Sequence, residues 1–326
     1  MAHKIAGIDL CHGGIRIVVL GSGFRKIQVD SVEEIALPAG CWKRDDNNEL
    51  SLSEDCLRLL REWVEGNLAQ GDVAVVSYPA IFSIIKTLKF PFKDPEKIRT
   101  ALPFQLIGNF PADIEEIVAD FDFVETGNKD ASVIAAGVIK EKFAGFLSGL
   151  KEANIDPRVV TSDGFALRDL MKFVDTGRRN ENLLFANVCG DRIEIFASSA
   201  GKPAYVRNIY LHGIAGNGDM AGYASRELKA AILAFMTREG GRIDGVVAGG
   251  DESSEIFGIA LDLFDEFGIP RLDFNDLQIE MEGAGEVGGV FMKAFSLAIR
   301  GLLPAEQGRI NFRRGEFIYS GNLRFI

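Results

Sequence analysis

The sequence has few of the residues that build metal and nucleic-acid sites. Its 326 residues include four cysteines and three histidines. No two cysteines are spaced as Cys-x-x-Cys, which argues against a zinc site and is consistent with a reducing compartment. The net charge is −11. Because affinity for nucleic acid depends on Lys and Arg side chains that release counterions, we expect no nucleic-acid partner.

Long apolar runs are also missing. No uninterrupted apolar stretch reaches the roughly 20 residues that a membrane-spanning helix needs. Asp9 and Arg16 interrupt the apolar run near the N-terminus, which argues against an ordinary signal peptide. With 47% hydrophobic and 25% charged residues, the composition is typical of a globular protein. We therefore expect the chain as given to be soluble and long enough for two domains.

Three glycine-containing turns follow apolar strands. The stretch GIDLCHGGIRIVVL (7–20) predicts a strand, a turn and a returning strand, and NLLFANVCGDRIEIFASSAGKPAYVRNI (182–209) repeats that pattern. In the third case the strand 245–248 meets Gly249 and Gly250 and leads into a helix. Backbone N–H groups in such turns can converge on phosphate oxygens, although a single turn of this kind is weak evidence.

Apolar spacing predicts several helices. One covers 50–71, with Ser51 and Glu54 as a capping box, and another spans Met220 to Thr237. The segment DGFALRDLMKFVDTG (163–177) carries one apolar stripe and is predicted to be the helix that crosses between the domains. An apolar helix, VGGVFMKAFSLAIRGLL, comes last.

Residues 81–125 have a different pattern, which indicates a small α/β insertion. Asp94 and Pro95 are typical of a helix start, and Pro103 is expected to bend or break that helix. Two antiparallel strands, IVADFDFVE and ASVIAAGVI, are predicted to follow, joined through the turn GNKD.

Three such turns, ordered along two successive α/β halves, resemble the actin, Hsp70 and sugar-kinase superfamily. Within it the chain most resembles the family of PilM from type IV pili and the cytoplasmic domain of GspL from type II secretion. The resemblance covers nearly the whole chain, from GIDLCHGGIRIV through YPAIFSIIKTLKFPF, ALPFQLIGNFPADIEEIVADF and TSDGFALRDLM to YVRNI, VVAGG and FSLAIRGL.

The resemblance implies an α/β, actin-like (ribonuclease H-like) two-domain fold with a small α/β insertion of the PilM/GspL type. The expected parts are domain I at 1–165 with the insertion at about 78–140, domain II at 166–287, a C-terminal helix at 288–308 that returns towards domain I, and a basic juxtamembrane tail at 309–326.

The resemblance also implies a nucleotide cleft between the domains. Its expected lining is Asp9, Cys11, His12, Gly13, Gly14, Asn187, Cys189, Gly190, Asp191, Gly249 and Gly250. An actin-like ATPase needs a carboxylate in each hairpin to organise Mg²⁺, with small residues beside the phosphates.

This chain departs from that pattern at both hairpins. The first hairpin keeps Asp9, but Asn187 stands where the second carboxylate belongs, and Cys11, His12 and Cys189 are bulkier than the pattern allows. We therefore expect a degenerate site with no catalytic residue, no metal and no ATP–Mg²⁺. Asp191 compensates for Asn187 only if the hairpin register slips.

On the implied fold, Cys11 and Cys189 face each other across the cleft. They are either a metal or redox pair or, as buried cysteines usually are, small apolar residues. His12 offers a contact for an anion in the same place.

The C-terminal stretch RINFRRGEFIYSGNLRFI (309–326) carries four arginines against one acid, Glu316. It is either a solvated tail or the cytoplasmic flank of a membrane helix. The resemblance implies the second, with a spanning helix after residue 326. It also implies that Arg309, Ile310, Asn311 and Phe312 dock on the body as a short peptide of PilN docks on PilM. The alternative is a frayed terminus.

The favoured function is a non-enzymatic scaffold of the type II secretion assembly platform, at the cytoplasmic face of the bacterial inner membrane. The implied partners are the secretion ATPase (GspE-like), platform proteins (GspM-like and GspF-like) and a second copy in a homodimer. The alternatives are a PilM-like pilus protein that binds ATP, and an active actin-like ATPase or kinase. The carboxylates Glu115, Glu116, Asp120 and Asp122 form either an acidic docking strip or a solvated face, and they assign no binding residue.

Overall fold

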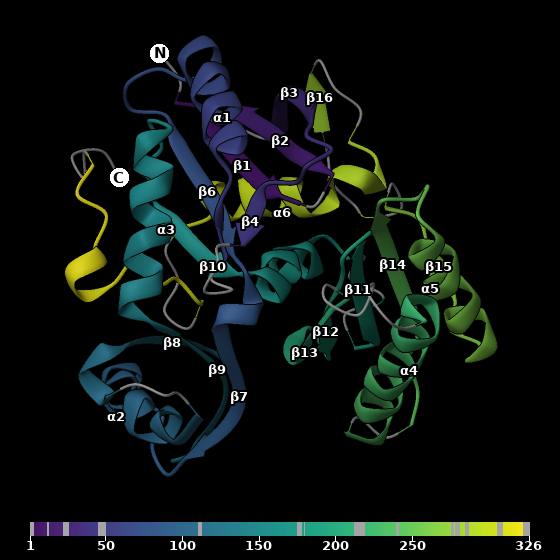
Figure 1. The fold of residues 1–326 in the computed structure, drawn as a ribbon. Coiled ribbons are helices and arrows are strands. Elements are labelled where there is room, and N and C mark those ends of the chain that lie inside the picture. The colour runs from purple at the N-terminus through teal and green to yellow at the C-terminus, as the bar shows by residue number, and fades with distance from the viewer. Residues whose placement is uncertain are drawn as a thin grey trace.

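A computed structural model of the chain describes residues 3–11, 13–21, 26–44, 50–109, 113–174, 178, 180–211, 219–238, 241–274, 277, 281–283, 287–304 and 309–321. Figure 1 shows two large sheets side by side, with a smaller sheet and its helix below the first.

The first large sheet has six strands in the order β10-β6-β1-β2-β3-β16. Its strands are β1 (Ile5–Leu10), β2 (Gly14–Gly21), β3 (Ile27–Ala36), β6 (Val73–Tyr78), β10 (Val159–Ser162) and β16 (Met281–Gly283). The predicted hairpin is present as the antiparallel pair β1–β2, and β6 lies parallel to β1. Every residue of β1, β2 and β6 is buried, because helices cover both faces of the sheet.

One face of this sheet carries α6 (Met292–Leu302), which packs on β1, β2 and β6. The approach is so close at Gly7 that a Cβ there would lie 2.0 Å from the backbone oxygen of Ala294. The helices α1 (Glu54–Asn67) and α3 (Lys140–Glu152) lie together on the other face (Figure 1). The short pair β4 (Trp42–Arg44) and β5 (Leu50–Leu52) precedes α1.

The second large sheet has five strands in the order β13-β12-β11-β14-β15. Its strands are β11 (Asn182–Cys189), β12 (Arg192–Ser199), β13 (Lys202–Tyr210), β14 (Gly245–Gly250) and β15 (Arg271–Leu272). The second predicted hairpin is the antiparallel pair β11–β12, and β14 runs parallel to β11. The helices α4 (Met220–Arg238) and α5 (Glu255–Glu266) pack on this sheet around an apolar core of their own.

The insertion is a three-stranded sheet in the order β7-β9-β8 with one helix, α2 (Pro95–Leu106). Its strands are β7 (Ser83–Phe90), β8 (Ile117–Thr126) and β9 (Ala131–Ile139). Phe90, Ile98, Leu102 and Phe121 belong to a separate small core. Short 3₁₀ turns complete the chain at η1 (Ala80–Phe82), η2 (Ile107–Asn109), η3 (Ile114–Glu116), η7 (Gly289–Phe291) and η8 (Gly315–Phe317).

The predicted cap of α1 was wrong, and α2 is not broken at Pro103, where a bend or a break was expected. Ser53, and not Ser51, caps α1 by accepting from the backbone N–H of Cys56 at 3.2 Å, because Ser51 is taken into strand β5. Pro103 does not end α2, which continues to Leu106. Leu102 and Leu106 are fully buried on either side of it, so packing outweighs the backbone hydrogen bond that proline removes.

The crossover segment also differs from the prediction of an α-helix with one apolar stripe. It forms the 3₁₀ helix η4 (Asp163–Phe173), which packs against both β12 and α6. The five residues from Asp163 to Leu167 are all buried, so the segment has no single apolar face for an amphipathic helix to present. This burial places the carboxylate of Asp163 at the junction of the two large sheets.

Candidate functional site

The three predicted turns come together between the two large sheets. Arg192, at the start of β12, donates from Nη2 to the carbonyl oxygen of Leu10 at the end of β1, at 3.1 Å. Gly249 on β14 is the register partner of Asn187 on β11, which brings the third turn beside the second. His12 lies outside the described residues.

Close packing accounts for several glycines of these turns. A Cβ on Gly14 would lie 2.3 Å from the carbonyl oxygen of Ile35, and one on Gly249 would lie 2.3 Å from that of Gly289. Gly250 has a φ of +118°, which L side chains rarely adopt. Gly13 and Gly190, in contrast, have open space where a Cβ would be. Packing and backbone conformation within the chain therefore explain why residues 14, 249 and 250 are glycines. A bound phosphate group is not needed to explain them.

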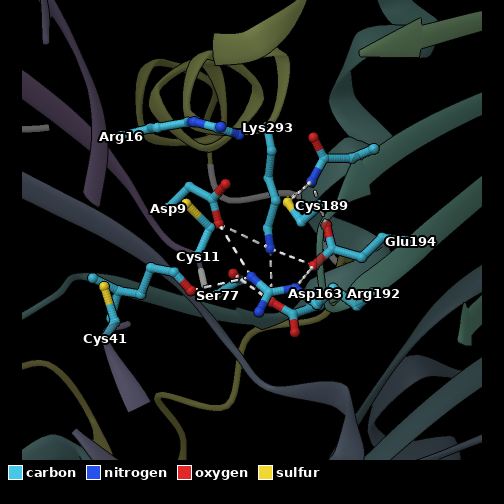
Figure 2. A network of polar contacts seen from close by, with 12 residues as sticks. Asp9, Cys11, Arg16, Cys41, Ser77, Asp163, Cys189, Arg192, Glu194 and Lys293 are labelled. Carbon is cyan, nitrogen blue, oxygen red and sulfur yellow. Dashed lines mark hydrogen bonds and ion pairs between the residues drawn. The ribbon is translucent and has the colours of Figure 1, made fainter. Parts of the chain in front are cut away.

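A buried lysine occupies the centre of the junction, as Figure 2 shows. The Nζ atom of Lys293, on α6, lies 2.6 Å from Glu194 Oε1, 2.9 Å from Asp163 Oδ1 and 3.0 Å from Asp9 Oδ1. These carboxylates come from β12, η4 and β1. Lys293 therefore joins both large sheets and the crossover between them.

Arg192 is a second buried cation beside the same carboxylates. Its Nε donates to Glu194 Oε1 at 2.7 Å, and its guanidinium nitrogens lie 3.6 Å from Asp191 Oδ2 and 3.7 Å from Asp9 Oδ1. Asn187 donates from Nδ2 to the other oxygen, Glu194 Oε2, at 2.9 Å. Asn187 therefore orients the carboxylate of Glu194, its register partner on β12. The register of the β11–β12 hairpin does not slip between Asn187 and Cys189.

Further donors complete the surroundings of Asp163. Ser77 and Tyr210 donate hydroxyl hydrogen bonds to it at 2.8 Å and 3.0 Å, and the backbone N–H of Ala80 donates at 3.2 Å. Burial alone would raise the pKa of Asp163, but attraction to Lys293 and Arg192, with these hydrogen bonds, holds it at about 2. Asp163 is therefore ionised at neutral pH.

The other charges follow from the same geometry. Burial alone would lower the pKa of Lys293, but the three carboxylates hold it above its usual value. Burial raises the pKa of Glu194, although Lys293 beside it acts in the opposite direction. A buried ammonium is tolerated only when it is paired and hydrogen-bonded, and here three carboxylates contact Nζ and outweigh the repulsion from Arg192.

Cys11 and Cys189 are both buried near this junction. Burial and then the charge of Asp9 raise the pKa of Cys11 to about 11, and burial raises the pKa of Cys189 as well. Both thiols are therefore protonated at neutral pH, whereas metal binding and disulfide exchange need the thiolate. Across the described part of the chain, no three His, Cys, Asp or Glu residues are grouped so that they could hold a metal ion.

The junction does not fit the Mg²⁺ ion that an actin-like nucleotide site would need. Magnesium is held by carboxylate and water oxygens around one small cation. Here the oxygens of Asp9, Asp163 and Glu194 already surround the ammonium of Lys293, with Arg192 beside it. A metal ion at this point would meet two positive charges of the protein itself.

Sequence reasoning found Asp9 but missed Lys293, Asp163, Arg192 and Glu194. A signal was present for Lys293, which is a charge within an apolar helix, whereas Arg192 and Glu194 alternate with Ile193 and Ile195, a pattern that also fits a strand with one face in water. A charged residue in such a run must find a buried partner. Which partners it finds depends on the crossover and on α6, whose placement the local sequence does not reveal.

The C-terminal segment forms a second feature, lying along β10, the edge strand of the six-stranded sheet. The backbone N–H of Phe312 donates to the carbonyl oxygen of Val160 at 2.8 Å, and the N–H of Val160 donates to Asn311 Oδ1 at 3.1 Å. Ile310 and Phe312 are buried in the main core. In Figure 1 this segment is the yellow trace beside α3.

Three arginines of this segment pair with acids of the body. Arg314 Nε lies 2.8 Å from Asp120 Oδ2, and Arg313 Nη1 lies 2.8 Å from Asp156 Oδ1. Arg309, which is only 1% exposed, lies 3.6 Å from Asp169. These arginines are therefore not the side chains of a solvated tail.

These contacts also change the interpretation of the acidic run. Asp120 and Asp122 on β8 are buried, and Asp122 pairs with Arg168. Glu115 and Glu116 are exposed. The four carboxylates therefore form neither one docking strip nor one solvated face.

No protein-family model and no curated protein matches this sequence. Solved structures do match in fold. A PilM–PilN type IV pilus biogenesis complex is similar with a TM-score of 0.73 and 17% identity, over 93% of this chain and 99% of that one. The cytoplasmic domain of EpsL, an inner-membrane component of the type II secretion system of Vibrio cholerae, is similar with a TM-score of 0.52 and 17% identity, over 96% and 99%.

A protein of unknown function from Bacteroides thetaiotaomicron, described as having an actin-like ATPase fold, matches with a TM-score of 0.50 and 13% identity, over 90% of this chain and 95% of that one. The predicted fold is confirmed: the chain has the actin-like ATPase fold. None of the helices that the structure describes is both long enough and apolar enough to cross a membrane.

Proposed function

We propose that this chain is a non-catalytic actin-like scaffold in an inner-membrane platform that assembles a type II secretion system or a type IV pilus. The likeness to a PilM–PilN complex and to the EpsL cytoplasmic domain supports this class of assembly. The scaffold acts at the cytoplasmic face of the bacterial inner membrane. It recruits an assembly ATPase (GspE-like) and contacts membrane subunits (GspM-like and GspF-like).

The observation that carries the non-catalytic part is the buried lysine. Lys293 brings its own positive charge to Asp9, the carboxylate that the resemblance assigns to the Mg²⁺ site, and Arg192 adds a second. ATP carries several negative charges and is bound together with Mg²⁺ in phosphoryl-transfer sites. The nucleotide site is degenerate because the chain fills the metal position itself.

Two platforms compete for the finer assignment. The docked segment Arg309–Phe312 favours the secretion platform, because the chain supplies within itself the contact that the resemblance gives to a separate PilN peptide. The higher TM-score of the PilM–PilN complex, 0.73 against 0.52, favours the pilus platform as the second candidate. If the chain belongs to a pilus platform, its own segment Arg309–Phe312 makes the contact on β10, and a partner peptide binds at another place.

The test is a pair of binding measurements on the purified chain. Calorimetric titration with ATP and Mg²⁺ is expected to give no saturable heat, because the metal position is filled. Immobilised nucleotide-free protein is expected to retain the purified assembly ATPase or a platform subunit from the same organism. Saturable Mg²⁺-dependent ATP binding that Asp9→Ala abolishes would overturn the degenerate site. Failure to retain any of these proteins would overturn the scaffold role.

A further inference from the structure

A groove of about 510 Å³ lies between the inserted sheet and the second large sheet. One wall is formed by β7, β8 and β9 and carries Lys89 and Glu125. The other wall is formed by β12, β13 and the end of α4 and carries Lys202 and Arg238. Figure 1 labels the strands of the two walls, β7, β8 and β9 on one side and β12 and β13 on the other. Its volume is in the range of ligand-binding sites.

The charge of the groove is opposite to that of the molecule. Lys89, Lys202 and Arg238 face it with Glu125 as the one acid in its lining, although the whole chain has a net charge of −11. Among the described residues, no ion pair involves Lys89 or Lys202, and both side chains are exposed. A positive groove on an acidic protein is a local exception that attracts negatively charged groups.

Glu125 is placed where it leaves Lys89 largely uncompensated. Both residues are register partners of Ser132, Lys89 from β7 on one side and Glu125 from β8 on the other. Two strand spacings separate them, which is roughly 10 Å. That spacing is between backbones; among the described residues, no ion pair joins the side chains of Lys89 and Glu125.

The remaining lining suits a polypeptide better than a nucleotide. Ser132 and Ser199 offer hydroxyl groups, the hydroxyl of Thr87 accepts from Arg238 Nη1 at 3.2 Å, and the apolar members are Val124, Pro203 and Ala204. None of these side chains is aromatic, so a nucleobase would find no ring on which to stack. An extended polypeptide segment in which carboxylate side chains alternate with small polar ones would contact the cations of the groove and also its hydroxyl groups.

We propose that this groove binds an extended acidic segment of a partner protein, with Lys89, Lys202 and Arg238 as the contacting cations. The proposal does not depend on the scaffold function or on the state of the nucleotide position. It assigns an interaction surface to the face where the insertion meets the second sheet.

The test uses the full chain and a fluorescein-labelled peptide of alternating Glu and Ser, with a Gln–Ser peptide of the same length as the uncharged probe. Fluorescence anisotropy at an ionic strength of about 0.15 M, where distant charges are screened, is expected to show saturable binding of the Glu–Ser peptide alone. The double variant Lys89→Glu/Lys202→Glu is expected to weaken this binding by about tenfold or more. The matched control is Lys26→Glu/Lys97→Glu, which makes the same charge change at two exposed lysines outside the groove.

The control variant is expected to retain affinity within about twofold, since long-range charge alone is screened. An equal loss in both double variants would overturn the proposal, because it would mean attraction to net charge and not to the groove. So would unchanged binding in the groove variant. Titration with pyrophosphate and with ATP in the absence of metal completes the test. Displacement of the peptide from wild type by either at equimolar concentration would assign the groove to a small anion and overturn the peptide assignment.

Discussion

At the scale of single residues, Lys293 and Asp163 decide the character of the junction. Lys293 is wholly buried and is tolerated because three carboxylates face its Nζ atom. Asp163 is the most fully bonded of these, with donors from Ser77, Ala80 and Tyr210 as well. Its pKa of about 2 lies below the ordinary 3.8 of an aspartate. A depressed carboxyl pKa means that ionised Asp163 stabilises the fold.

Asp163→Asn tests this contribution and its pH dependence. The variant keeps the shape but leaves Lys293 with one carboxylate fewer, so we expect a loss of about 3 kcal/mol in the free energy of unfolding at pH 7. The stabilisation by Asp163 is fully present above the unfolded-state pKa of about 4 and is lost as the pH falls through about 2. Urea unfolding between pH 7 and pH 2 should therefore show that the difference in free energy of unfolding between wild type and variant becomes smaller as the pH falls.

The matched control is Asp262→Asn, at an exposed acid of α5. It should change stability by less than about 0.5 kcal/mol at any of these pH values. If the difference in free energy of unfolding between wild type and Asp163→Asn stays constant from pH 7 to pH 2, the lost contribution is packing and not charge.

At the scale of elements, the C-terminal segment completes the six-stranded sheet. An edge strand such as β10 presents unpaired backbone groups, and proteins commonly cover them. Here Phe312 and Asn311 satisfy both backbone groups of Val160. The ring of Phe312 also packs edge-on against Phe143 of α3, with centroids 5.9 Å apart. The segment is therefore part of the core that joins α3 to the sheet.

Phe312→Ala should remove most of that anchoring. Truncating a fully buried phenylalanine costs about 3–5 kcal/mol, and we expect a loss of that size in urea unfolding. Limited proteolysis should then cut within 309–321 before the body is cleaved. Phe104→Ala is the control, because Phe104 on α2 is 67% exposed, and it should lose less than about 0.5 kcal/mol. Equal stability of the two variants would show that the segment is not anchored through Phe312.

At the scale of the whole molecule, the charged junction holds the two large sheets in one arrangement. Lys293 bonds to β1 in the first sheet and to β12 in the second, and Arg192 spans the same boundary through Leu10. Among the described residues, none of the inserted sheet contacts Lys293, although one face of this sheet lies in the main core and Asp122 on β8 pairs with Arg168 of η4. We therefore expect the two lobes to behave as one unit, with the insertion outside the group of residues that contact Lys293.

Lys293→Met should loosen this junction selectively. It keeps an apolar stem of similar length but leaves Asp9, Asp163 and Glu194 without their shared cation. Hydrogen exchange under native conditions is expected to accelerate by about tenfold or more in both hairpin turns, and much less in β7, β8 and β9. Lys229→Met, which removes an exposed lysine paired with Glu266 on the surface of the second lobe, serves as the control and should leave exchange unchanged. Uniform acceleration in all three sheets would instead indicate a general loss of stability.

The parts of the fold that were predictable are those with short-range causes. The two hairpins follow from apolar strands on either side of a glycine turn, and the start of α2 follows from Asp94 and Pro95. The prediction for Ser51 failed because strand pairing with 42–44 competed for that residue. The prediction for 163–173 failed because contacts on every side replaced the single apolar face that a stripe implies.

The local sequence by itself determined that the chain would form two strand–turn–strand units with a later strand, glycine turn and helix, because backbone conformation and apolar periodicity are properties of neighbouring residues. It also determined that an unusual lysine stood in an apolar helix. Only the tertiary structure decided which groups meet that lysine. Asp9, Asp163, Glu194 and Lys293 are separated by tens to hundreds of positions along the chain. They meet because α6 packs against β1 at Gly7 and η4 joins the two sheets, and electrostatic pairing depends on distance in space, not on distance in sequence.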